Sequence, residues 1–240
     1  MQEKMKRYSF GKMAKSYARH AQAQQRIAAR LLQECASQHY ARVLDLGCGQ
    51  GSVLSALPFF NICANEFVGV DRALEMLQEH PRACLGVDRV RLICQNFEDW
   101  DILPCTLLIS ASALQWAQDL DALCAKLARH CAHIALAIHT SGSLQEVHAF
   151  LGTRSPLRGC QEVLSILKAR FADFKTRLWV ERFQQSFDAR APFLAQLKYT
   201  GLLGGGLDFK RAKALRFEIP YESLSYEVVF LVGSLQKGER

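Results

Sequence analysis

The chain has 240 residues, of which 50% are hydrophobic and 22% are charged, and its formal net charge is +7. This composition is ordinary for a soluble globular protein, and the length suits one well-buried domain or one domain with an inserted cap. The sequence has no apolar run near the roughly 18 residues that a membrane-spanning helix needs. The basic N-terminal residues are not followed by an apolar stretch, so we expect no secretory signal, no membrane partner and a cytoplasmic protein.

Residues 10–34 predict one or two helices, because they are rich in Ala, Gln, Arg and Leu and contain no Pro. From residue 42 onward, predicted strands and helices alternate. The strands are expected at 42–46, 67–71, 89–94, 105–110 and 132–138, and the helices near 51–57, 73–79 and 119–130. Such alternation predicts an α/β fold with a mostly parallel sheet, helices on both faces, and ligands at the carboxyl ends of the strands.

After residue 140 the simple alternation ends. Helices are predicted at 143–151, 162–172 and 188–199, a strand at 175–180, and a last strand at 226–233 that we expect to pair antiparallel at the end of the sheet. We therefore expect a single domain over 1–240. Its parts are a helical N-terminal segment at 1–35, a cofactor-binding core at 42–140, a small helical cap with substrate elements at 141–222, and a last strand and tail at 223–240.

The stretch from Val43 to Gly51 indicates the binding site. Its apolar strand ends at Asp45 and is followed by a glycine at every second position, namely Gly47, Gly49 and Gly51. Glycines here can adopt positive φ and leave room for a ligand over the helix that follows. The next predicted strand ends at Asp71, twenty residues after Gly51, where a carboxylate can accept hydrogen bonds from ribose hydroxyls. The spacing G-x-G-x-G differs from the dinucleotide fingerprint G-x-G-x-x-G and is similar to motif I of the Rossmann-like class I S-adenosylmethionine (SAM) methyltransferases.

The other strand ends supply further candidate residues. Arg72 follows Asp71, and Asn96 with Phe97 offers an amide and a flat apolar face for an adenine, although Asn96 is equally a turn residue. Ser110 and Gln115 follow the fourth strand, where the methyl donor and the acceptor should meet. His139 ends the fifth strand, where a lone histidine is more often a satisfied core group than a catalyst.

The chain as a whole resembles the malonyl-acyl-carrier-protein O-methyltransferases that open biotin synthesis. The residues that carry the likeness are Phe10, Tyr17, His20-Ala21 and Gln24, the D-L-G-C-G-Q-G loop, Ser112 to Trp116, Gly142 to Glu146, Leu197 to Gly201, and Ser225 to Val228. The resemblance implies methyl transfer from SAM to the free carboxylate of a malonyl thioester on an acyl carrier protein. It implies Gln24, Asp45, the three glycines, Asp71, Arg72, Asn96, Phe97, Ser110 and Gln115 as cofactor-binding residues, with Tyr17, His139 and Lys198 near the acceptor and no metal. The chain departs from the family in two places. The basic stretch between Gly201 and the last strand is reshaped around Gly204–Gly206, and the loop at 152–160 is short.

Two other readings stay open. One is a SAM methyltransferase for a small molecule, such as a quinone precursor or a free carboxylic acid. The other is a nucleic-acid binder or modifying enzyme, suggested only by a pI near 9. The absence of a basic stretch interleaved with aromatics opposes it, so we expect no nucleic-acid partner. The basic charge is concentrated at 1–30 and 161–220. The basic surface would also attract an acidic carrier protein, and a solvated helix face explains any single charge as well. The nine cysteines are scattered without a C-x-x-C pair, so we expect reduced core thiols and no disulfide framework.

Overall fold

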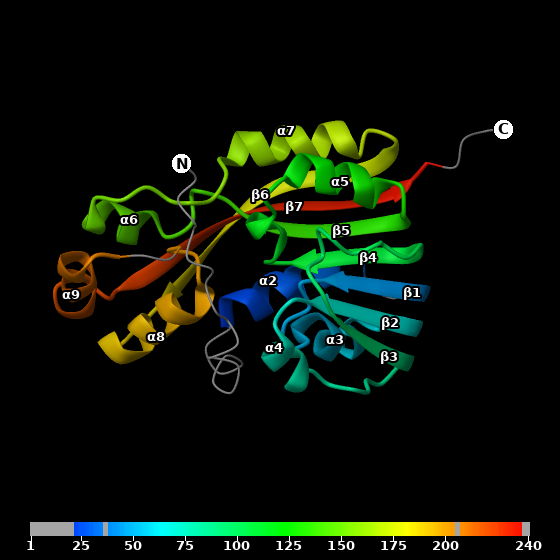
Figure 1. Ribbon diagram of the computed structural model, residues 1–240, viewed down its shortest axis with the longest axis horizontal. Coiled ribbons are helices and arrows are strands. Elements are labelled where there is room, and N and C mark those ends of the chain that lie inside the picture. The colour runs from blue at the N-terminus through cyan, green and yellow to red at the C-terminus, as the bar shows by residue number, and fades with distance from the viewer. Residues whose placement is uncertain (1–21, 36–37, 205–206, 237–240) are drawn as a thin grey trace.

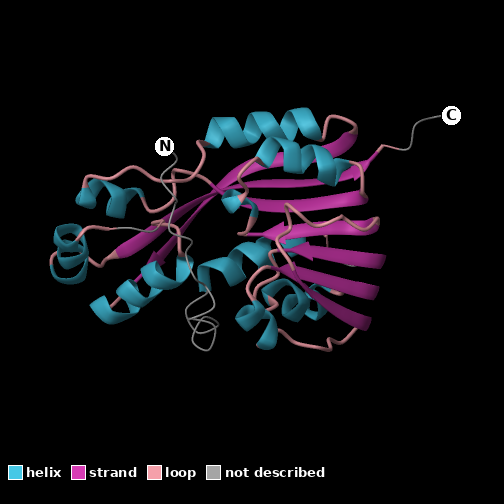
Figure 2. Ribbon diagram, viewed as in Figure 1, coloured by secondary structure: helices cyan, strands magenta, loops and turns pink. Residues whose placement is uncertain are grey.

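The computed structural model describes residues 22–35, 38–204 and 207–236, and its centre is a seven-stranded sheet (Figures 1 and 2). The strands are β1 (His39–Leu46), β2 (Cys63–Asp71), β3 (Val87–Cys94), β4 (Cys105–Ala111), β5 (Cys131–His139), β6 (Phe174–Ser186) and β7 (Ser223–Leu235). Their order is β3-β2-β1-β4-β5-β7-β6. β7 is antiparallel to both of its neighbours, and the other six strands run in one direction. The carboxyl ends of the parallel strands therefore lie along one edge, which is where α/β sheets bind ligands.

Helices pack on both faces of the sheet, and each face has its own hydrophobic core. On one face lie α2 (Gln22–Gln33), α3 (Ser52–Ala56), α6 (Gln145–Leu151) and α8 (Arg190–Thr200), and on the other lie α5 (Leu120–Ala128) and α7 (Cys160–Arg170). Figure 1 shows α5 and α7 above the sheet and α2 and α3 below it. The short elements are α4 (Leu74–Gln78), α9 (Phe209–Phe217) and the 3₁₀ turns Leu57–Phe60 and Leu114–Trp116. None of the described helices is long and apolar enough to cross a membrane.

The strands and helices follow local sequence signals. β1 ends in the fully buried run Val43, Leu44 and Leu46, which suits a central strand covered on both faces. Asp119 begins α5 by accepting a hydrogen bond from the Ala122 N–H at 2.9 Å, and Gly201 at φ +68° ends α8. The pattern of the sequence thus predicts these elements within a few residues of their observed ends.

β6 and β7 extend beyond the rest of the sheet. The last residue of β5, His139, pairs with Val228, but β6 and β7 continue for five more pairs, from Arg182 with Glu227 to Ser186 with Ser223. We call residues 182–186 and 223–227 the β6–β7 ribbon. In Figure 1, α6, α8 and α9 gather around this ribbon at the end of the molecule where β5 finishes.

Two expectations about the chain after residue 140 were wrong, and one helix there was not expected. The strand expected at 175–180 runs over Phe174–Ser186, because its polar second half pairs in the ribbon and not in the covered sheet. The last strand is antiparallel as expected but lies between β5 and β6, so it is not the edge strand. The helix α9 was not predicted at all. Residues 10–21 of the first predicted helix lie outside the described part of the chain.

Candidate active site

The glycine loop between β1 and α3 adopts the backbone that its sequence predicts. Gly47, Gly49 and Gly51 have φ values of +74°, +52° and +81°. The Gly47 N–H donates to the Val70 carbonyl at 2.7 Å, which ties the loop to β2. A Cβ at Gly47 would lie 2.2 Å from the Cβ of Ala113, whereas a Cβ at Gly49 would meet nothing within 4 Å. Gly47 is therefore required by packing, and Gly49 faces open space that a ligand can enter.

Asp71 closes the loop from the end of β2. Its carboxylate accepts hydrogen bonds from the Gly49 N–H at 3.0 Å and from the Ala73 N–H at 2.8 Å. Burial raises the pKa of Asp71, and the two backbone donors oppose that rise. Each carboxylate oxygen has a second lone pair, so the group can still accept from a ligand hydroxyl.

Asp45 is a buried carboxyl group with no protein partner. It is 1% exposed, and neither of its oxygens has a hydrogen-bond partner within the described part of the chain. Burial, and secondarily repulsion by Asp71, raise the pKa of Asp45 to about 8. A buried acid without a partner is costly and marks a site that a cation or donor can complete.

A pocket opens beside Asp45 and the glycine loop that Asp71 binds. Its lining consists of Gln24 and Ala28 from α2, Asp45, Gly47 to Gln50, Ser52 and Val53 around the glycine loop, and Ala111 and Ser112 after β4. The Oε1 atom of Gln24 and the hydroxyl of Ser112 are buried there without a hydrogen-bond partner among the described residues. The pocket therefore combines an acid with unpaired polar groups from three separate segments.

The remaining predicted cofactor residues divide into two groups. Phe97 lies near the loop, with its Cε1 atom 3.9 Å from the position of a Cβ at Gly47, and Gln115 donates from its Nε2 to the Ser112 carbonyl at 2.8 Å. Three other residues are engaged elsewhere or exposed, namely Ser110, Asn96 and Arg72. The buried Ser110 hydroxyl donates to the Leu46 carbonyl at 2.7 Å. The Asn96 side chain donates to the Asp99 carboxylate and accepts from the Glu98 N–H, both within its own turn. Arg72 is exposed. The structure thus brings Phe97 and Gln115 to the loop region but joins Ser110 to β1.

Of the three residues expected near the acceptor, the structure describes two, of which His139 is buried and Lys198 is exposed. Tyr17 lies outside the described residues. His139 is 1% exposed, its Nδ1 lies 3.3 Å from the Ser143 hydroxyl, and burial lowers its pKa to about 3. Lys198 is exposed on α8 and does not line the pocket. A neutral, enclosed imidazole cannot exchange protons with solvent at working pH, so His139 has the properties of a core group.

The chain is similar to known methyltransferases in sequence and in structure. Residues 43–133 match the family model described as a methyltransferase domain. A malonyl-[acyl-carrier protein] O-methyltransferase from Chlorobium phaeovibrioides is 28% identical over 228 residues, covering 87% of this chain and 84% of that protein. The protein of the same name from Chlorobium luteolum is 29% identical and covers 70% of each chain. The YcgJ protein from Bacillus subtilis superposes with a TM-score of 0.62 at 16% identity, covering 88% of this chain and 99% of that one, which shows the shared fold.

The family match over residues 43–133 and the names of the relatives together indicate a SAM-dependent methyltransferase. The mostly parallel sheet with helices on both faces is the fold class that the sequence predicted. In this methyltransferase the pocket between the glycine loop and α2 is the candidate cofactor site. All nine cysteines are free thiols, and five of them are buried. Among the described residues no three His, Cys, Asp or Glu side chains come together to hold a metal ion.

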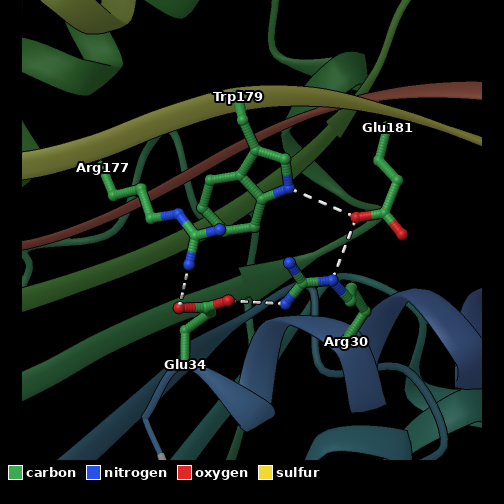
Figure 3. A network of polar contacts seen from close by, with 5 residues as sticks. All are labelled: Arg30, Glu34, Arg177, Trp179 and Glu181. Atoms are coloured by element: carbon green, nitrogen blue, oxygen red, sulfur yellow. Dashed lines mark hydrogen bonds and ion pairs between the residues drawn. The ribbon is translucent and has the colours of Figure 1, made fainter.

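Helix α2 of the methyltransferase is anchored to β6 by a network of charges around Trp179 (Figure 3). Arg30 binds Glu34 at 2.7 Å and Glu181 at 3.0 Å, and Arg177 binds the other oxygen of Glu34 at 2.8 Å. The Trp179 indole N–H donates to the Glu181 carboxylate at 3.3 Å. The network fixes the last turns of the helix whose first turn supplies Gln24 to the pocket.

The indole ring of Trp179 joins this network to the core. The guanidinium carbons of Arg30 and Arg177 lie 5.1 and 4.8 Å from its centroid, within the range of cation–π attraction. The ring also stacks on Phe230 of β7, with centroids 5.0 Å apart and an interplanar angle of 10°. Trp179 thus connects α2 to the two strands that form the ribbon.

Sequence reasoning missed Ser112 and Ala28 as pocket residues. Ser112 has φ +62°, an unusual backbone for a residue other than glycine, and it lines the pocket directly after β4. No local pattern predicts that conformation. For Ala28, the spacing of four residues from Gln24 on one helix face was an available signal.

Proposed function

We propose that this methyltransferase transfers a methyl group from SAM to the free carboxylate of a malonyl thioester carried by an acyl carrier protein, giving the methyl ester. The observation that carries the proposal is the relative of that name, which aligns over 84% of its own length. The polar groups of the pocket support its cofactor, SAM. No specific observation favours a quinone precursor or a free small acid as the acceptor. The free thiols fit a reducing compartment such as the cytoplasm.

The pocket residues fit the polar groups of SAM. Asp45 would bind the α-ammonium group, because its buried, unpaired carboxyl needs a cationic donor. Asp71 would accept from the ribose hydroxyls while Gly49 leaves space for the ligand beside it. Gln24 and Ser112 add unpaired polar atoms to the same wall. When bound, SAM supplies an electrophilic methyl group on a sulfonium centre.

The chemistry of the acceptor agrees with the absence of an obvious base among the described pocket residues. A malonyl carboxylate is already ionised at neutral pH, so its oxygen attacks without losing a proton. The protein then has to position the carboxylate in line with the methyl group and exclude water. His139 contributes as a neutral buried side chain, which makes it unsuitable as a base. We propose that Tyr17 lies near the acceptor and that Lys198 or an arginine of the 141–222 cap holds the substrate carboxylate.

Mass spectrometry tests the reaction directly. We expect purified protein with SAM and malonyl-acyl carrier protein to add the mass of one CH₂ group to the acyl chain, and to leave acetyl-acyl carrier protein unchanged because it lacks the free carboxylate. Methylation of the acetyl form, or none of the malonyl form with SAM bound, would reject the proposed acceptor.

Calorimetry with Asp71→Ala tests the cofactor site. We expect SAM binding to be lost, because the ribose acceptor is removed, and we expect it to be retained in the matched variant Asp88→Ala on the exposed surface of β3. Equal SAM affinity in the two variants would show that Asp71 does not bind the cofactor.

A further inference from the structure

Helix α9 is a short cationic helix that is hardly packed against the protein. None of its nine residues is buried, and the side chains of Phe209 and Phe217 at its two ends are 86% and 60% exposed. It carries Lys210, Arg211, Lys213 and Arg216, and no acidic residue lies within it. Large exposed aromatics on a helix with one sign of charge indicate a binding surface more than a structural element.

The contacts of α9 explain how the helix is held in place while its outer face stays open. Asp208 caps it by accepting from the Arg211 N–H at 2.8 Å, and the Arg211 Nε donates to the Leu151 carbonyl of α6 at 3.2 Å. Only Leu215 and Ala214 in the helix are partly covered. A helix of this length is marginal by itself in water, so these few contacts define its position. They leave Lys210 and Lys213 exposed. Arg211 pairs with Asp208, and the guanidinium carbon of Arg216 lies 5.1 Å from the ring centroid of Phe217.

The surroundings of α9 extend the same surface. Phe150 of α6 is 40% exposed, and Arg190 lies 4.9 Å from the ring centroid of the half-exposed Tyr221. The acids nearby are Asp208, which pairs with Arg211 at 3.1 Å, and the exposed Glu218 and Glu222. Figure 1 shows α9 beside α6 and α8 at the tip of the β6–β7 ribbon, at the end of the molecule where the parallel strands finish. The surface thus lies at the end of the sheet from which a substrate approaches the pocket.

We propose that α9 is the docking surface for the acidic acyl carrier protein, a conclusion that depends on the proposed function. Lys210, Lys213 and Arg216 meet carboxylates of the carrier, and Phe209 and Phe217 cover apolar side chains beside them. Charge complementarity selects this occupant, because a second copy of this chain with its net charge of +7 would be repelled. The carrier then sits at the tip of the ribbon while its flexible arm delivers the malonyl group toward the pocket.

The test compares two double variants with the same change in charge. Lys210→Glu/Lys213→Glu reverses two charges of α9, and Lys168→Glu/Lys175→Glu does so on the exposed surfaces of α7 and the start of β6. Binding of fluorescently labelled acyl carrier protein is measured by anisotropy at low and high salt. We expect the α9 variant to raise the Kd about 10-fold at low salt, and the control less than about 2-fold, with the difference shrinking at high salt. Phe209→Ala should weaken binding by a few-fold without altering the thermal unfolding temperature.

Methyl transfer is measured separately, so that the two proposals fail differently. For the α9 variant we expect a raised KM for malonyl-acyl carrier protein, with unchanged kcat, SAM affinity and KM for malonyl-pantetheine, which has no carrier surface. Equal losses in both double variants would show only a net-charge effect, and an unchanged Kd in the α9 variant would place the carrier elsewhere; either result overturns the docking surface. Wild-type protein that binds the carrier through α9 but does not methylate it would instead overturn the proposed reaction and leave the surface intact.

Discussion

Asp45→Asn should make the ligand-free protein more stable at alkaline pH. Asp45 is 1% exposed, without a hydrogen-bond partner in the described chain, and burial raises its pKa to about 8 from an ordinary value of 3.8. The folded state therefore keeps a proton that the unfolded state releases above about pH 4. Stability falls as pH rises through this window, and it becomes level above pH 8, where both states are ionised. Asn has nearly the same shape and does not ionise, so it removes this dependence.

The magnitude follows from the two pKa values. Between pH 5 and pH 8 the unfolded carboxyl is largely ionised while the folded one keeps its proton over most of the range, so each pH unit lowers the free energy of unfolding by about 1.36 kcal/mol. Over these three units wild type should lose about 4 kcal/mol relative to Asp45→Asn. The same substitution should weaken SAM binding at pH 8 by roughly 10- to 100-fold, the value of a hydrogen bond to a charged group.

Urea unfolding followed by circular dichroism at pH 5, 6, 7 and 8 measures the effect, since urea adds no ionic strength. Asp88→Asn, which changes an exposed carboxyl of β3, is the matched control and should follow wild type. If the curves of Asp45→Asn and wild type stayed parallel across this range, the carboxyl would have a partner or solvent that the structure does not show, and its assignment as an unpaired buried acid would be refuted.

Three further predictions concern the loop, His139 and Trp179. Gly47→Ala should lower the free energy of unfolding in urea by about 1–3 kcal/mol, because its Cβ would overlap Ala113. Gly49→Ala adds a Cβ that meets no protein atom, so it should cost only about 1 kcal/mol of stability yet block SAM binding in calorimetry. A larger loss of stability in Gly49→Ala than in Gly47→Ala would contradict the assignment of the open space. Because burial lowers the pKa of His139 to about 3, only the unfolded state gains its proton below pH 6.5, so wild type should lose about 2 kcal/mol more than His139→Gln between pH 6.5 and pH 5, and an equal loss would show a solvated imidazole. Trp179→Leu should raise the KM for SAM several-fold at unchanged kcat, because it loosens α2. Trp100→Leu changes a tryptophan on the other face of the sheet and should leave this KM unchanged. Equal KM values in the two variants would show that the network around Trp179 does not affect the pocket.

The core of the fold and the cofactor loop could be predicted because their signals are local. The apolar run before Asp45 predicts a buried strand, the glycines after it predict a left-handed loop, and Asp71 follows the next apolar run at the right distance. The structure places both acids and the glycines at the edge of the sheet where the alternation of strands and helices requires them. These features depend on neighbours in sequence, which a reader of the chain can see.

The features that were missed depend on the tertiary structure. α9 is polar on most of its surface, so no apolar periodicity marks it, and the second half of β6 resembles a loop because it pairs in a ribbon exposed to solvent. Ser110 lies near the end of β4 and Ser112 directly follows the strand, yet the first bonds to Leu46 and the second lines the pocket. Which of two nearby hydroxyls faces the ligand is decided by strand register and by the backbone of Ser112, neither of which is written in the local pattern.

Trp179 gives this methyltransferase an intrinsic optical reporter. The chain contains three tryptophans, and this one is stacked on Phe230 beneath two guanidinium groups, one of which belongs to α2. Indole emission responds to charges and polarity in contact with the ring, so any displacement of α2 changes the environment of this fluorophore directly. A version of the protein in which Trp100 and Trp116 are replaced by Phe would therefore signal the position of the helix beside the cofactor pocket in real time, with no added label.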